Sequence, residues 1–210
     1  MLLDPSNLML FIVASAALSA APGPDILFVL VQSSSRGALA GVLTTLGLCT
    51  GLIVHSSAAA LGVSAVFQSS ALAFSVLKYI GVGYLLYLAF KAIRSRNQAD
   101  ADQPQAVGEA GRKLYLRGII MNITNPKVSL FFLAFLPQFT SPENGSIPMQ
   151  MLILGALFIV VAFAVFSIAA LAAGVIGKRL QGNSFFQRFG CWLTASIFVG
   201  LALKLAMTRR

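Results

Sequence analysis

Six long runs of apolar residues occupy most of the chain and limit what it can fold into. The runs cover residues 8–31, 40–66, 72–92, 118–136, 149–176 and 190–207. A helix that crosses the hydrocarbon core of a bilayer needs ~20 mostly apolar residues, and each run has about that length. Only 10% of the residues are charged, whereas soluble domains carry roughly 25%. We therefore predict an all-α transmembrane protein of about six helices, embedded in a lipid bilayer, with no sizeable soluble domain.

The basic residues behind the net charge of +9 are distributed along the chain as expected for loops of a membrane protein. Lys and Arg occur in the connections after the first, third and fifth runs, but not at 67–71 or 137–148. Cytoplasmic loops are the basic ones, so we expect both termini outside. Arg209 and Arg210 oppose this orientation, and the lack of basic residues before the first run supports it. The same lack argues against a signal peptide, so the first run is expected to be a retained helix. No nucleic-acid partner is predicted.

A polar, charged stretch divides the runs into two groups of three. We predict a first three-helix repeat at 1–93, a cytoplasmic linker at 94–116 and a second three-helix repeat at 117–210. With three spans in each half, the halves have opposite orientations, which is typical of an inverted repeat. The first run of each half is interrupted by proline, at Pro22-Gly23-Pro24 and at Asn125-Pro126.

Each proline break is expected to end one half-helix and begin another, because proline lacks a backbone donor and clashes with the preceding turn. In hydrocarbon the freed backbone groups need partners inside the protein or in a polar cavity. Gly23 offers a point of close approach and permits unusual backbone angles. The alternative is that Pro24 and Pro126 only kink packed helices.

Asp25 and Lys127 each follow a proline directly, deep within an apolar run. Burying either one unpaired costs about 2.5–3.5 kcal/mol on insertion scales. Asn125 and Pro126 form a helix start signal, as N-cap and first helical residue. Lysine opposes the helix dipole at this position, so Lys127 is expected to have a specific anionic partner. That partner could be Asp25, a substrate carboxylate, or each in turn; a permanent structural ion pair is the alternative.

Other polar and small residues are secondary candidates. Asn122 lies one turn before the second break and could line the same cavity or hydrogen-bond between helices. Gly47 and Gly51 belong to a small-xxx-small pattern that favours close helix packing and permits a homodimer. His55, the sole histidine, is expected to be a neutral buried side chain bonded to a neighbour.

No catalytic or metal-binding pattern is visible, so neither an enzyme nor a cofactor is predicted. With one histidine and the two cysteines Cys49 and Cys191, no metal-ligand spacing can be assembled. No Walker-type glycine loop is present. Uphill transport would have to use an ion gradient or a partner.

At Pro22-Gly23-Pro24-Asp25 and at 122–127 the chain resembles the LysE/RhtB family of amino-acid exporters. The resemblance runs nearly end to end and includes Lys78 and Tyr79 in the third run and Pro137-Gln138-Phe139 after the fourth. It implies proton-driven efflux of amino acids across the bacterial inner membrane, with Asp25 and Lys127 at positions that matter.

One deep acid suits a zwitterion better than a dibasic amino acid, so small neutral substrates such as threonine, homoserine or leucine are favoured. Two alternatives stay open. One is an inorganic-ion transporter of the same architecture, and the other is a membrane scaffold without a solute pathway.

Overall fold

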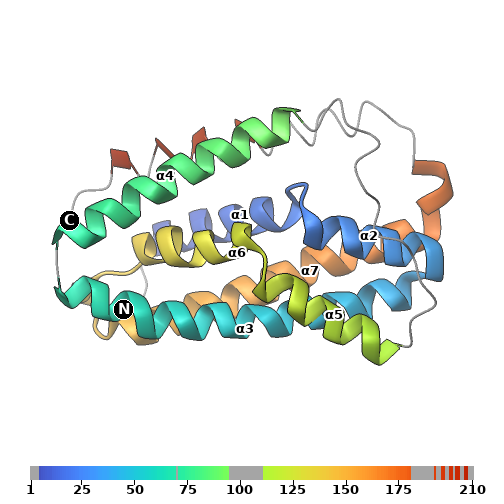
Figure 1. Ribbon diagram of the computed structural model, residues 1–210, viewed down its shortest axis with the longest axis horizontal. Helices are drawn as coiled ribbons and strands as arrows, with labels where there is room; N and C mark the ends of the chain where they lie inside the picture. Colours follow the sequence, from blue (N-terminus) through green and yellow to red (C-terminus); the bar gives the residue numbers. More distant parts are fainter. Residues whose placement is uncertain are drawn as a thin grey trace.

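The computed structural model describes residues 5–69, 71–94 and 111–180, together with single positions between 192 and 207. Within these residues the chain is helical and has no strand, as expected of an all-α protein. Most helices run along the long axis of the molecule (Figure 1). In chain order the elements are α1 (Pro5–Ala20), α2 (Pro24–Arg36), α3 (Ala38–Ser69), α4 (Ala71–Arg94), α5 (Gly111–Ile123), α6 (Pro126–Leu130), the π-helical turn η2 (Phe131–Phe135), the 3₁₀ turns η3 (Leu136–Phe139) and η4 (Pro142–Asn144), and α7 (Ile147–Leu180).

Two of the helices are long and apolar enough to cross a bilayer unbroken. They are Ala38–Gly62 within α3 and Ile147–Val175 within α7. Two further helix pairs pass the same test together but bend sharply between their members, by 59° between α1 and α2 and by 48° between α5 and the helix that starts at Pro126. If each bent pair is counted as one span, the described residues contain up to four candidate spans. Additional spans at α4 and at 190–207, most of which lies outside the described residues, stay predictions.

Both bends coincide with the proline motifs. Pro24 is the first residue of α2 and Pro126 the first of α6, where a missing N–H costs nothing and the fixed φ suits a helix. Gly37 ends α2 with a φ of 86°, a backbone conformation that favours glycine. The two breaks lie near the middle of the long axis (Figure 1). The inverted-repeat relation between the halves stays a prediction.

The fifth helix begins earlier than the predicted second half. We expected a linker up to residue 116, but α5 starts at Gly111, and residues 95–110 lie outside the described part. The boundary predicted from hydropathy lies beside Arg117, the last charged residue before the apolar run, whereas Arg112 and Lys113 already belong to the first helical turn. A helix can emerge from the apolar layer without ending there.

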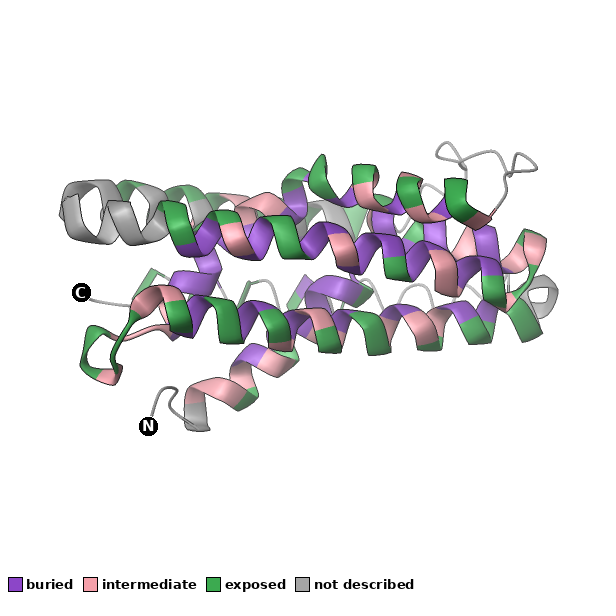
Figure 2. Ribbon diagram, turned by 90° about the horizontal axis from the view of Figure 1, so that it is seen from below, coloured by how far each residue is buried: buried purple, intermediate pink, exposed green. Residues whose placement is uncertain are grey.

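The central helix of the packing is α3, which contacts both α5 and α7, while α2 packs against α3 and α7 and α1 against α7. Buried positions follow the inner faces of the long helices and exposed ones their outer faces (Figure 2). Large apolar side chains such as Leu61 and Val175 are mostly exposed, at 77% and 83%. On a membrane protein such faces suit contact with lipid chains.

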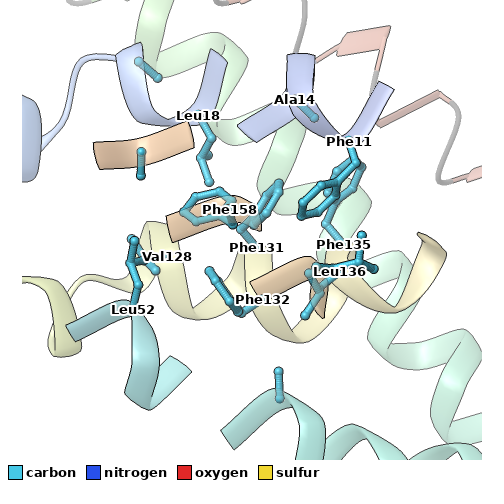
Figure 3. Packing of buried hydrophobic residues seen from close by; sticks show 14 of the residues in the cluster. Phe11, Ala14, Leu18, Leu52, Val128, Phe131, Phe132, Phe135, Leu136 and Phe158 are labelled. Carbon is cyan, nitrogen blue, oxygen red and sulfur yellow. The ribbon is translucent and has the colours of Figure 1, made fainter. Parts of the chain in front are cut away.

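An aromatic cluster anchors the second broken helix. The rings of Phe131 and Phe132 of η2 both pack against Phe158 of α7, with ring centroids 5.2 and 5.1 Å apart and the second pair edge to face. On the other side Phe135 and Phe139 pack together, and Phe139 meets Phe11 of α1 at 5.1 Å. Figure 3 shows the rings converging between α1, α7 and the segment that follows α6. This packing holds η2 against α7 and η3 against α1.

The backbones of α3 and α5 are in direct contact where the two helices cross. A Cβ atom added to Gly47 would lie 2.1 Å from the carbonyl oxygen of Tyr115, and one added to Gly118 would lie 2.7 Å from that of Thr44. Backbone atoms cannot move aside as a flexible side chain can. The crossing therefore needs glycine on both helices.

Replacing Gly47 with alanine is expected to lower the thermal unfolding temperature in detergent by about 5 °C or more, because overpacking against rigid backbone costs ~2 kcal/mol. Circular dichroism during heating measures the change. Gly62→Ala is the matched control on the same helix, since a Cβ atom there meets no atom of the described residues within 4 Å. Equal unfolding temperatures for the two variants would contradict this account of the crossing.

Candidate functional site

The two proline breaks, about a hundred residues apart in the chain, meet at the side chain of Lys127. Its Nζ donates to the carbonyl oxygen of Ala21 at 2.9 Å. Carbonyls at a helix C-terminus lack intrahelical donors, and the prolines that follow Ala21 supply none. A Cβ atom on Gly23 would lie 3.4 Å from the same Nζ. Lys127, only 8% exposed, thus supplies the hydrogen-bond donor that this carbonyl group of the first broken helix lacks.

Gly23 has ordinary backbone angles and lies beside the Lys127 side chain. Its φ of −177° and ψ of 174° are extended, a conformation open to any residue. The unusual backbone angles that glycine permits are therefore not used here. A Cβ atom at this position would make ordinary van der Waals contact with the lysine side chain, 3.4 Å from Nζ and 3.6 Å from Cδ.

Asp25 lies in the first turn of α2, where the helix dipole favours an acid. It is 6% exposed, and its Oδ2 accepts a hydrogen bond from Nδ2 of Asn122 at 3.0 Å. Lys127 and the side-chain amide of Asn125 also act on this carboxylate electrostatically. The acid of the first break therefore faces the polar residues of the second.

The helix start predicted at the second break is confirmed. Asn125 is the N-cap of α6, and its Oδ1 accepts from the backbone N–H of Lys127 at 3.0 Å. Asn122 and Asn125 are buried at 1% and 3% exposure. The cap sets the course of the chain at Pro126 and so places the lysine.

Two residues of α3 complete the surroundings of Asn122. A Cβ atom on Gly51 would lie 2.8 Å from both Cβ and Oδ1 of Asn122, so glycine makes room for this amide. Nε2 of His55 lies 3.0 Å from the carbonyl oxygen of Asn122. Because a carbonyl only accepts, this ring nitrogen must carry the hydrogen.

Sequence reasoning did not place His55 in the site. It was expected to bond a neighbour, and it does, but the neighbour belongs to the second break. One signal could have revealed this: Gly51 and His55 are four residues apart and share one face of the helix. Nothing in the sequence shows that Asn122 faces them.

The remaining candidates lie elsewhere. Gly47 is at the crossing with α5, and Tyr79 is 61% exposed on α4. Lys78 lies on the same helix, but its side chain is outside the described residues. Pro22 lies in the connection between α1 and α2 and Pro24 at the start of α2.

The site brings one carboxylate, one ammonium group and two amides together away from solvent. In such surroundings charge-assisted hydrogen bonds are stronger than in water. Opposite charges on separate half-helices can hold the two ends of a small zwitterion. The part of the chain that the structure describes contains no group of three His, Cys, Asp or Glu side chains arranged to hold a metal ion.

Comparison with known proteins gives consistent results. A family model described as LysE type translocator matches residues 16–209. The membrane protein YrhP of Bacillus subtilis, which carries the description "uncharacterized", is 30% identical over 210 residues, covering 96% of this chain and 99% of the relative. Leucine efflux proteins of Salmonella typhimurium and Salmonella typhi are each 28% identical over 207 residues, covering 95% of this chain and 94% of theirs. No solved structure gives a significant match.

Proposed function

The chain belongs to the LysE type translocators, and from this premise we propose that it exports small neutral amino acids, such as threonine, homoserine or leucine, by proton antiport. The proposed location is the bacterial inner membrane, with both termini outside. Relatives named as leucine efflux proteins support amino-acid efflux. The observation that carries the proposal is that Lys127 of the second break bonds the Ala21 carbonyl at the first break and acts electrostatically on Asp25.

The substrate is proposed to bridge the two charged residues. Its carboxylate binds Lys127, and its ammonium group binds Asp25. Nζ of Lys127 donates to a backbone carbonyl at 2.9 Å, and a carboxylate is a stronger acceptor for an ammonium group than a neutral carbonyl is. The substrate can therefore take the place of Ala21 on the lysine. One acid and one base match a zwitterion, whereas a dibasic amino acid leaves one positive charge unmatched.

Proton coupling is proposed to act on Asp25. A proton that arrives from the outer side neutralises the carboxylate, weakens its bond to the substrate ammonium group and releases the substrate outward. The protein then carries the proton inward as it returns. The bends of 59° and 48° at the two breaks supply joints about which the site can open to either side, as in other transporters with discontinuous helices.

A panel of radiolabelled amino acids tests the function directly. Cells that express the protein are loaded with each amino acid, and its release is compared with that from cells without the protein. We expect faster release of one or more small neutral amino acids, no change for lysine or arginine, and loss of uphill export when a protonophore collapses the gradient. Equal release of every amino acid from both kinds of cell would contradict the proposal.

A further inference from the structure

We propose that Asp25 and Asn122 together form a two-oxygen acceptor for the primary ammonium group of the substrate, so that the site rejects N,N-dialkylated amino acids. This inference rests on the proposed function and deepens it. It assigns Asn122 as a specificity-determining residue and His55 as the residue that positions it.

The first observation is a pair of buried oxygens without donors. The bond from Nδ2 of Asn122 to Oδ2 of Asp25 leaves Oδ1 of each side chain. Both Oδ1 atoms are buried, and neither accepts a hydrogen bond from the part of the chain that the structure describes, although the Asn125 amide also acts on the carboxylate of Asp25. Asp25 and Asn122 are 6% and 1% exposed. Buried acceptors are nearly always satisfied in folded proteins, so two on one bonded pair indicate a ligand that donates.

The second observation is that the orientation of the amide is determined by its partners. A carboxylate oxygen can only accept, so the amide must turn its nitrogen toward Asp25 and its oxygen away. The neighbouring Asn125 cannot take over this role, because its own Oδ1 caps α6 by accepting from the N–H of Lys127. The free oxygen of Asn122 is therefore placed before any substrate arrives.

The third observation is the support that Asn122 receives from α3. His55 donates to its backbone carbonyl at 3.0 Å. Gly51 leaves room for its side chain, since a Cβ atom there would lie 2.8 Å from Oδ1. Supporting contacts of this kind hold a binding group in its productive geometry.

The charge of the site selects the ligand. The acceptor pair contains a carboxylate, so it favours a cation that can donate at least two hydrogens. A primary ammonium group has three N–H bonds, enough to donate one to each oxygen. An N,N-dimethylated ammonium group keeps its charge but has one N–H, so it must leave one of the two oxygens unsatisfied.

The test compares leucine with N,N-dimethylleucine, or the same pair for another amino acid if the efflux panel identifies one. Each unlabelled compound competes with the labelled amino acid for exchange in proteoliposomes. For the unsubstituted protein we expect half-inhibition of exchange to need an about 10- to 100-fold higher concentration of the dimethylated compound than of leucine. This is the loss expected for one hydrogen bond to a charged group. Equal potency of the two compounds overturns the inference, even where export itself is normal.

Substitutions separate hydrogen bonding from steric exclusion. Asn122→Leu keeps the approximate size of the side chain but removes the acceptor. The apparent affinity for leucine should therefore fall about 10-fold, while the apparent affinity for the dimethylated compound should not change. If the methyl groups are excluded by size alone, the discrimination persists in this variant and the inference fails. His55→Leu should also reduce the discrimination, and His55→Gln, which can still donate to the Asn122 carbonyl, should restore it.

Two controls complete the design. Tyr115→Phe removes a hydrogen bond of 2.9 Å to Thr50 between α5 and α3, seven residues before Asn122 in the chain, and should leave the discrimination unchanged. Replacing sodium with choline in all buffers should also have no effect; a requirement for sodium would show that a metal cation occupies the two oxygens and would overturn the inference. Absence of any amino-acid exchange would instead refute the proposed function, and this inference with it.

Discussion

Replacing Asp25 with asparagine is expected to abolish proton-driven export while exchange of substrate across the membrane persists. Asparagine keeps the size of the side chain, and its oxygen can still accept from Asn122, which donates to Asp25 at 3.0 Å. The variant cannot bind and release a proton at this position, so the proton gradient can no longer drive transport. Losing the negative charge also weakens the hold on the substrate ammonium group, and affinity should fall by roughly 10- to 100-fold.

Reconstituted protein allows the two activities of the Asp25→Asn variant to be measured separately. Exchange is followed with labelled substrate on one side and unlabelled substrate on the other, without a pH gradient. Driven export is followed after a pH jump, with the protein fully saturated so that weak binding does not hide the result. If the pH jump still stimulates export as in the unsubstituted protein, Asp25 is not the coupling group.

The second large effect is expected from Lys127→Met. Methionine cannot donate to Ala21 as the lysine does at 2.9 Å, and it removes a cation that acts on Asp25. Removing one charge of a buried set costs about 3–5 kcal/mol, so the unfolding temperature should fall by at least roughly 6 °C. Transport should be lost, because the substrate carboxylate has no cation to meet.

The double variant Asp25→Asn, Lys127→Met distinguishes transport from structure. Neutralising both groups removes the uncompensated charge, so most of the lost stability should return while transport stays absent. Normal efflux in this double variant would show that the two residues serve only the fold, as the scaffold alternative requires. Lys127→Arg adds a control for size: Lys127 is buried and its Nζ lies 2.9 Å from the carbonyl oxygen of Ala21, so the wider guanidinium group should not restore transport.

Local chemistry made much of this protein predictable from its sequence. The apolar runs predict helices because only fully hydrogen-bonded segments are stable in hydrocarbon. Pro24 and Pro126 predict the positions of both breaks, because a proline inside a helical run removes a backbone donor and clashes with the preceding turn, whatever surrounds the helix. Asn125 predicts the cap of α6 because a cap is made within three residues. Each of these depends on neighbours in the chain.

Contacts between distant segments could not be predicted in the same way. His55 and Asn122 are 67 positions apart, Asp25 and Asn122 are 97 apart, and Ala21 and Lys127 are 106 apart. Asn122 could have faced lipid, a neighbouring helix or the site with the same local sequence. Which side of α5 turns inward depends on the crossing with α3.

The membrane-embedded helical class, both breaks and the two charges beside them can thus be read from the amino-acid sequence. The contact of Lys127 with Ala21, the extended backbone of Gly23 and the positions of His55 and Gly51 beside Asn122 are known only from the folded molecule. The difference lies in the range of the interactions. Helix starts, breaks and burial costs follow from a residue and its near neighbours, whereas the partner of a buried polar group depends on how whole helices pack.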